Sequence, residues 1–214
     1  IQQAVLAAED REFYNHGGIS PIGIARAALN NLTGGSTQGG STITQQYAKI
    51  AFLTQDRTWK RKINEALLAF KLETVISKEQ ILEDYLNTIY FGRNANGIEA
   101  AAVAYFNKSV NELDYTEGAV LASVIKSPSG LNPEDNLSGL KARWSYVLDS
   151  MLVLGDITLA QRDAASFPEM IPFKQKDRLV GQVVFLLTAV DQHLLVNVVS
   201  VTDLHHGGMN IVSS

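Results

Sequence analysis

The sequence predicts a mainly α-helical protein with one large hydrophobic core. Apolar residues recur at helical spacing along most of the 214 residues, and Ser, Thr and Pro stand where several of these stretches begin. Apolar residues make up 46% of the chain and charged residues only 19%, a balance that fits either extra apolar surface facing lipid or a partner, or simply a well-packed helical domain. The length suffices for one core, or for one core with a small lobe.

Composition also excludes several classes of function. The net charge of −4 argues against nucleic acid as a general partner. The absence of cysteine excludes disulfide bonds and thiolate metal sites. No apolar stretch approaches the roughly 20 residues of a transmembrane helix. The chain has no initiator Met and starts inside a helical pattern, so we expect it to be a piece of a larger protein.

Helices are predicted in order from the N-terminus. The first spans 1–13 and ends in acidic residues. Ser20 as N-cap, with Pro21 in the first turn, starts a second helix that is expected to run to Asn31. The Ala-rich stretch 97–106 is the helix expected at the centre of the core. The other predicted helices span 44–52, 58–76, 77–90, 116–125, 137–154 and 158–166.

Capping residues support two of these helices. Ser77, with Gln80 three residues later, predicts a capping box, and Glu79 places an acid in the first turn. Thr116 is predicted to start its helix, with Glu117 in the first turn.

The remaining segments are predicted to be irregular or extended. The Gly-, Ser- and Thr-rich stretch 33–40 predicts a mobile loop, and 127–133 predicts an irregular one. The stretch 178–199 fits either helix or strand. The stretch 207–212 predicts a turn and a short strand, which would form a small β-hairpin at the C-terminus.

Two separated carboxylates are the first candidates for chemistry. Glu9 and Asp10 lie near the predicted end of a helix, where acids oppose the helix dipole. That placement suggests a role, although an isolated acidic pair is more often simply solvated. Glu65 follows Arg61 by four residues and Lys62 by three, so the three lie on neighbouring faces of one helix. They fit either a salt-bridged surface or a cationic cradle for pyrophosphate.

A glycine- and hydroxyl-rich stretch, 39–42, precedes the helix predicted over 44–52. Backbone N–H groups and hydroxyls at a helix start favour phosphate. The stretch lacks the lysine spacing of a P-loop, and by itself it also fits a flexible linker. Lys49, Arg57 and Lys60 add positive charge nearby.

The pattern Ser-x-x-Lys occurs twice, at Ser123–Lys126 and at Ser138–Lys141. Acyl-serine enzymes with this pattern also need Ser-Asp-Asn and Lys-Thr-Gly elements, which the sequence lacks. We therefore reject a transpeptidase or β-lactamase activity for this chain.

Taken in order, the motifs resemble the peptidoglycan glycosyltransferase domain, glycosyltransferase family 51, of class A penicillin-binding proteins. The resemblance is strong over 1–154, and 204–212 resembles the segment that leads towards a transpeptidase domain. The stretches that carry it are Glu9-Asp10 with Phe13 and His16, then 39–46, Arg61-Lys62 with Glu65, 81–87, and Lys126 with Ser129.

The resemblance implies a lysozyme-like large lobe and a small hydrophobic jaw lobe, within about 20–60, that dips into the membrane. It implies a glycosyltransferase domain over 1–174 and a C-terminal segment over 175–214 leading towards a transpeptidase domain. The implied location is the outer face of the bacterial cell membrane. The implied reaction joins lipid II to the growing glycan strand through β-1,4 bonds, with inversion and release of undecaprenyl pyrophosphate. Moenomycin is the implied inhibitor.

The resemblance also assigns residues. Glu9 is implied to be the general base, and Glu65 to orient Arg61 or a metal ion or to stabilise the transition state. Mg²⁺ or Mn²⁺ is expected without identified ligands, and no organic cofactor is expected. The implied substrate- and pyrophosphate-binding residues are Asp10, Phe13, His16, Ser41, Thr42, Gln46, Lys49, Arg57, Arg61, Lys62, Lys126 and Ser129.

Two other classes of function stay open at this point. A lysozyme-like muramidase or lytic transglycosylase would use one acidic Glu on glycan strands and would need neither the Arg-Lys helix nor the 39–42 loop. A non-catalytic membrane-binding module would tolerate the loss of Glu9. An exposed Glu9, far from Glu65 and without a cleft, would favour that module.

Overall fold

The computed structural model describes residues 1–21, 40–53 and 59–173. Regular secondary structure in these residues is helical, apart from one isolated antiparallel bridge between Tyr90 and Asn96, so the predicted mainly α fold is confirmed. No helix in the described part is long and apolar enough to cross a membrane. All of the predicted loop over 33–40 except Gly40, and most of the helix predicted from Pro21, lie outside the described residues, as do 178–199 and 207–212.

The chain divides into one compact unit over Ile1–Phe173 and a second over Lys174–Ser214. The division falls close to the predicted boundary at 174, although the functions assigned to the two parts stay predictions. The predicted jaw, within about 20–60, is described only in part, so the two-lobed arrangement also stays a prediction.

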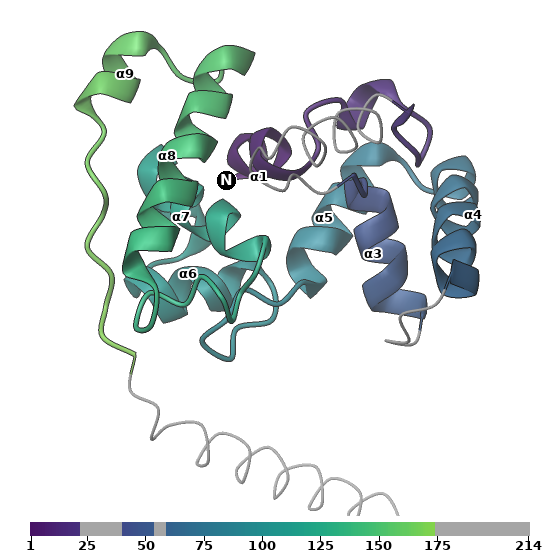
Figure 1. The fold of residues 1–214 in the computed structure, drawn as a ribbon, viewed down its shortest axis with the longest axis horizontal. Helices are drawn as coiled ribbons and strands as arrows, with labels where there is room; N and C mark the ends of the chain where they lie inside the picture. Colours follow the sequence, from purple (N-terminus) through teal and green to yellow (C-terminus); the bar gives the residue numbers. More distant parts are fainter. Residues whose placement is uncertain (22–39, 54–58, 174–214) are drawn as a thin grey trace, which may run out of the picture. The chain divides into compact units, whose positions relative to one another are not determined.

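Two groups of helices make up the first unit (Figure 1). In one group, α1 (Gln2–Glu9) packs against both α7 (Tyr115–Ile125) and α8 (Leu137–Leu154). In the other, α3 (Ile43–Phe52) packs against both α4 (Trp59–Val75) and α5 (Lys78–Thr88).

Helix α6 (Ile98–Phe106) contacts α5 on one side and α7 on the other, so it joins the two groups. The short helix α9 (Leu159–Ala164) packs on α8. Two 3₁₀ turns, η1 (Phe13–Asn15) and η2 (Val110–Glu112), follow α1 and α6.

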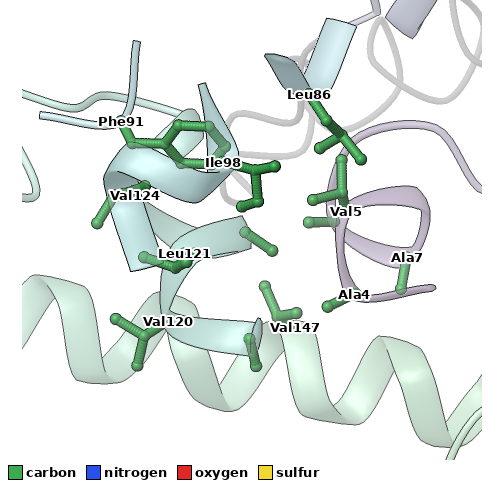
Figure 2. Close-up of a cluster of buried hydrophobic side chains, with 14 of the residues drawn as sticks. Ala4, Val5, Ala7, Leu86, Phe91, Ile98, Val120, Leu121, Val124 and Val147 are labelled. Carbon is green, nitrogen blue, oxygen red and sulfur yellow. The ribbon is translucent and has the colours of Figure 1, made fainter. Parts of the chain in front are cut away.

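The core centres on α7 rather than on α6, which corrects the expectation for 97–106. Nine successive residues of α7, Thr116–Val124, are buried, as expected of a helix surrounded by other elements. Helix α6 buries only one side and leaves Val103 half exposed. Figure 2 shows Val5 of α1, Leu121 of α7 and Val147 of α8 among the side chains of this core.

Helix starts follow the predicted chemistry with two corrections. Ser77 caps α5 as predicted, but the Gln80 side chain donates to Asp84 Oδ1 at 2.9 Å, so the second half of the predicted box is missing. Asp114, rather than Thr116, caps α7, because its carboxylate accepts from two backbone N–H groups of the first turn. Glu117 then completes a capping box with Asp114.

The first helix ends at Glu9, four residues before the predicted end at residue 13. The cause is Asp10, whose backbone leaves the helical region at φ −155°. Its carboxylate accepts a hydrogen bond from the Ile43 N–H at the start of α3, at 3.0 Å, and contacts His16 Nε2 at 2.9 Å. These long-range partners satisfy Asp10 only when the chain turns away from the helix axis after Glu9.

The segment after η1 is pressed against α4 at Gly18. Gly18 has φ +77°, and a Cβ added there would lie 2.9 Å from the backbone of Ala69 and Phe70. Only glycine combines this conformation with so close an approach. The Gly18 carbonyl also accepts a hydrogen bond from the Thr42 hydroxyl at 2.7 Å, so this contact joins the first motif to the start of α3.

Gly18→Ala is therefore expected to destabilise the protein by about 2 kcal/mol or more, from the left-handed conformation and the backbone clash together. Urea unfolding measures the effect. Gly17→Ala is the matched control, because a Cβ at Gly17 meets nothing within 4 Å. Equal losses from the two substitutions would contradict the assignment of the effect to the Gly18 contact.

An extended segment after α9 runs back along the first unit (Figure 1). The Ile171 N–H donates to the Tyr105 carbonyl at 2.9 Å, and the buried Arg93 donates through Nη1 to the Ile171 carbonyl at 2.9 Å. Phe167 packs edge-on against Trp144 of α8, with ring centroids 5.4 Å apart. Stretch 166–173 is thus part of the packed unit, which extends beyond the last helix.

Candidate active site

Glu9, the last residue of α1, is held by side chains from two other helices. Gln46 of α3 donates through Nε2 to Glu9 Oε2 at 3.0 Å, and Arg143 of α8 donates through Nη2 to Oε1 at 3.3 Å. The Glu9 side chain is 13% exposed. Burial raises the pKa of Glu9, while Gln46, Arg143 and the charge of Lys126 act against this rise. A carboxyl with a raised pKa is suited to proton transfer.

A cavity of about 330 Å³ opens beside Arg143. Burial lowers the pKa of the Lys126 ammonium, and the positive charge of Arg143 lowers it further. Two cations in one cavity are best satisfied by an anionic or strongly polar ligand. The residues that line the cavity are Lys126, Ser127, Gly130, Leu131, Gly139, Ala142, Arg143 and Tyr146.

A second cationic group surrounds Glu65 on α4. The Glu65 carboxylate is buried, and Arg61 Nη1 lies 3.0 Å from its Oε2 while Lys62 pairs with its Oε1. The Lys62 ammonium also donates to the Ser41 hydroxyl at 2.7 Å, immediately before α3. Of the two interpretations left open for this pattern, the burial of Glu65 argues against a simple solvated surface.

The first half of α3 lies between the two carboxylates. Its start contacts the Glu65 group through Ser41, and Gln46, one turn further on, contacts Glu9. The predicted motifs therefore meet around one helix end. That Glu9 and Glu65 line one cleft stays a prediction, since Glu65 is not among the residues that line the cavity beside Arg143.

Four of the predicted binding residues have supporting positions. The Phe13 ring is 1% exposed and lies in the core, and the buried Thr42 hydroxyl caps α3. Asp10 and His16 bond to each other, with side chains only 5% and 7% exposed. Their contact with substrate stays a prediction, and what the structure shows is that the two side chains hold each other at the end of α1. Of the other predicted residues, Lys49 and Ser129 are exposed, and Arg57 lies outside the described residues.

Arg143 is a candidate site residue that the motif analysis missed. It donates to the Ala8 carbonyl at 3.0 Å as well as to Glu9, and its guanidinium lies over the Tyr146 ring at 4.5 Å. The available signal was its position in the helix predicted over 137–154. Leu140 and Val147 lie three residues before and four after it, so Arg143 is a charge on an apolar face.

The first of the two Ser-x-x-Lys matches, at Ser123–Lys126, is buried at its serine. Ser123 is fully buried within α7, and its hydroxyl donates to the Ala119 carbonyl at 2.6 Å. A nucleophile must reach its substrate, so Ser123 is a packed helix residue.

The expected Mg²⁺ or Mn²⁺ would need carboxylate or imidazole ligands that gather at one point. Within the described residues, no three His, Asp or Glu side chains gather where they could hold a metal ion. Both carboxylate oxygens of Glu65 already pair with cations. The expected Mg²⁺ or Mn²⁺ therefore stays a prediction without identified ligands, and no step of the reaction is assigned to a metal.

Comparison with known proteins identifies the family. Residues 1–152 match the model of the transglycosylase family, and the chain belongs to that family. Penicillin-binding protein 1A of Neisseria flavescens is 49% identical over 171 residues, which is 79% of this chain and 21% of that protein. Penicillin-binding protein 1A of Mycobacterium tuberculosis is 48% identical over 176 residues, which is 80% of this chain and 22% of that protein.

The chain thus spans about a fifth of the length of these curated relatives. A crystal structure of penicillin-binding protein 1A from Haemophilus influenzae shares 25% identity and covers 62% of this chain and 17% of that one. Its TM-score of 0.38 is too low to support a conclusion about the fold.

The raised pKa of Glu9 gives a prediction for stability against pH. The folded state binds the Glu9 proton more tightly than the unfolded state, whose pKa is near the ordinary value of 4.5. Relative to Glu9→Gln, the wild type is thus most favoured below that value and loses this advantage as pH rises through the raised pKa. Urea unfolding of both proteins across this range measures the difference.

The control for this experiment is Glu83→Gln, which removes one exposed carboxylate from α5. If the free energy of unfolding changes with pH in the same way in both variants, the effect comes from net charge rather than from the burial of Glu9.

Proposed function

We propose that this chain is a peptidoglycan glycosyltransferase domain that polymerises lipid II. The observation that carries the proposal is the position of Glu9: a carboxyl with a raised pKa, paired with Arg143 beside a cavity that Lys126 also lines. Such a group can remove a proton from a hydroxyl while neighbouring cations stabilise an anionic leaving group. Membership of the transglycosylase family and the names of the relatives support the same reaction.

In the proposed mechanism, Glu9 accepts the proton of the GlcNAc 4-hydroxyl of incoming lipid II. The hydroxyl oxygen attacks the anomeric carbon of the MurNAc at the end of the growing strand. The bond from that carbon to the pyrophosphate oxygen breaks, and undecaprenyl pyrophosphate leaves with the electron pair. A single displacement inverts the anomeric centre and produces a β-1,4 bond. Glu9 then returns its proton to solvent.

The cations divide between two tasks in this proposal. Lys126 and Arg143 line the cavity next to Glu9, where charge moves during the reaction. Arg61 and Lys62 carry one more positive charge than Glu65 neutralises, and they lie beside Ser41 at the start of α3. We assign this second group, with the exposed Lys49, to pyrophosphate binding, because charge-assisted bonds to phosphate oxygens are strong.

The exposed face of α4 supports a membrane contact. Ile63, Leu67 and Phe70 follow one another at helical spacing and are 59%, 65% and 59% exposed. An apolar face of this kind fits a lipid surface, where a lipid-linked substrate is found. We therefore propose that α4 contacts a membrane. The family resemblance adds that this membrane is the bacterial cell membrane at its outer face, and that a transpeptidase domain follows in the full-length protein.

Leu67→Asp is expected to weaken binding to vesicles at least about tenfold, because burying one leucine side chain contributes about 1.5–3 kcal/mol. Co-sedimentation with anionic phospholipid vesicles measures it. Val153→Asp is the matched control, since Val153 is 75% exposed on α8, in the other group of helices. Equal weakening would attribute the effect to added negative charge.

The function is tested by incubating the chain with fluorescent lipid II, with and without moenomycin. Long glycan strands that moenomycin suppresses are expected. If the chain instead shortens preformed strands, it is a muramidase or lytic transglycosylase. If it does neither but binds vesicles, it is the non-catalytic module.

A further inference from the structure

A chain of two hydrogen bonds connects a fully buried tyrosine to Glu9. The Tyr85 hydroxyl on α5 donates to Gln46 Oε1 at 2.9 Å, and Gln46 Nε2 donates to Glu9 Oε2 at 3.0 Å. Tyr85 is 0% exposed, so its hydroxyl has no contact with solvent. The three residues come from α5, α3 and α1, which the fold brings to one point.

The direction of this chain is fixed by Tyr85. Burial raises the pKa of the Tyr85 hydroxyl well above its ordinary value, and the negative charges of Glu9 and Asp10 raise it further. Tyr85 therefore keeps its proton at working pH and remains a donor. A glutamine amide has one accepting end and one donating end. With Tyr85 donating to Oε1, the NH₂ group of Gln46 must face Glu9.

We propose that Tyr85 is a positioning residue for the reaction, acting through Gln46 to keep a donor on Oε2 of Glu9 and to leave Oε1 as the oxygen that takes the substrate proton. The proposal rests on the proposed function, because it assumes that Glu9 is the general base. Oε1 accepts a hydrogen bond from Arg143 at 3.3 Å and keeps a further lone pair, and because Arg143 lines the cavity we take Oε1 as the oxygen on the substrate side.

Removal of the Tyr85 hydroxyl would free the Gln46 amide to turn. With its carbonyl towards Glu9, Gln46 would repel the carboxylate and favour the protonated form. The other charged groups that face Glu9 are Arg143 of α8 and Lys126 after α7, with the Asp10–His16 pair adjoining. Those groups are unchanged in the variant, so any change in the titration of Glu9 would come from Gln46.

The test compares Tyr85→Phe with Tyr105→Phe in lipid II polymerisation between about pH 5 and pH 9, recorded as kcat/KM. Tyr105 is the matched control, because it is also 0% exposed and its hydroxyl donates one hydrogen bond, to the Phe91 carbonyl at 2.7 Å. Tyr85→Phe is expected to move the acid limb to higher pH. On the acid side of the profile, kcat/KM should fall by about 2- to 13-fold, which is the fold-change that corresponds to the loss of one hydrogen bond. On the alkaline side, kcat/KM should change little.

Tyr105→Phe is expected to lower the unfolding temperature to a similar extent without moving the acid limb. A uniform loss at every pH in Tyr85→Phe would overturn the proposal, since a purely structural role predicts that result. An equal movement of the limb in Tyr105→Phe would overturn it as well.

A double-mutant cycle tests the route through Gln46. In a Gln46→Met background, Tyr85→Phe is expected to have no further effect on the acid limb, because the amide that it orients is gone. A further movement would overturn the proposed route. The variant Glu9→Gln distinguishes a failure of the proposed base from a failure of the proposed role of Tyr85. If that variant polymerises lipid II like the wild type, the proposed base is wrong. If it is inactive and the limb in Tyr85→Phe does not move, only the role of Tyr85 is wrong.

Discussion

Replacing Glu9 by glutamine is expected to reduce lipid II polymerisation by about 10²–10⁴-fold, the usual effect of losing a general base. Glutamine keeps the size of the side chain and can still accept the hydrogen bond from Gln46, but it cannot take a proton at Oε1. Binding of moenomycin should persist, because the cavity cations Lys126 and Arg143 remain. Polymerisation rate and moenomycin affinity, measured on the same preparation, separate lost chemistry from lost binding.

The control is Glu12→Gln, three residues along the chain. Glu12 accepts a hydrogen bond from the Asn15 side chain at 3.0 Å, in an exposed position. The Glu12→Gln variant should retain near wild-type polymerisation activity. Retained polymerisation in Glu9→Gln itself would rule out Glu9 as the base, and parallel losses in both variants would indicate a general effect of removing acidic charge.

Local sequence patterns were sufficient for most of the helical architecture. The predicted helix over 137–154 agrees with α8, and those over 44–52 and 58–76 begin within one residue of α3 and α4. These helices are encoded by apolar spacing and by caps that lie within three residues of the helix start. Such signals lie within a few residues of the helix, so helices of this kind can be predicted from a single sequence.

Errors occurred where distant residues decide the structure. Helix α1 ends early because Asp10 bonds to Ile43, which lies 33 positions along the chain. Arg143 is 134 positions from Glu9 and belongs to none of the motifs quoted for the family resemblance, yet its guanidinium contacts the Glu9 carboxylate. Spacing along the sequence does not indicate a contact between residues this far apart. The residue type identified Glu9 as a candidate base, whereas only the fold shows that Gln46 and Arg143 hold its carboxylate.

The cationic residues show the same limit. The family resemblance implied that Lys49, Arg61 and Lys126 bind substrate or pyrophosphate, and that role stays a prediction. In the structure Arg61 pairs with Glu65 on α4, whereas Lys126 lines the cavity together with Arg143. A control arginine for Arg61 has to lie outside this region. Arg162 on α9 meets that condition, because it pairs with the exposed Asp149 at 2.6 Å and donates to the Ser145 hydroxyl at 2.7 Å.

Arg61→Ala is expected to lower lipid II turnover and moenomycin affinity by roughly 10- to 100-fold, since hydrogen bonds to charged groups contribute about 1.5–3 kcal/mol each. Stability will also fall, because the buried Glu65 loses one of its two partners. Stability alone therefore does not show whether Arg61 binds pyrophosphate. Turnover and affinity have to be measured at a temperature where the variant is fully folded.

Two further variants make the result specific. Arg61→Lys keeps a positive charge for Glu65 but loses the planar fork of donors that matches a phosphate group, so it should restore stability more fully than turnover. Arg162→Ala removes an ion pair and one hydrogen bond at the surface of α9, and is expected to cost about 1 kcal/mol or less and to leave turnover unchanged. If Arg61→Ala and Arg162→Ala lower turnover equally, net charge rather than a pyrophosphate site accounts for the cations of α4. If Arg61→Lys restores turnover completely, the planar fork is not what binds.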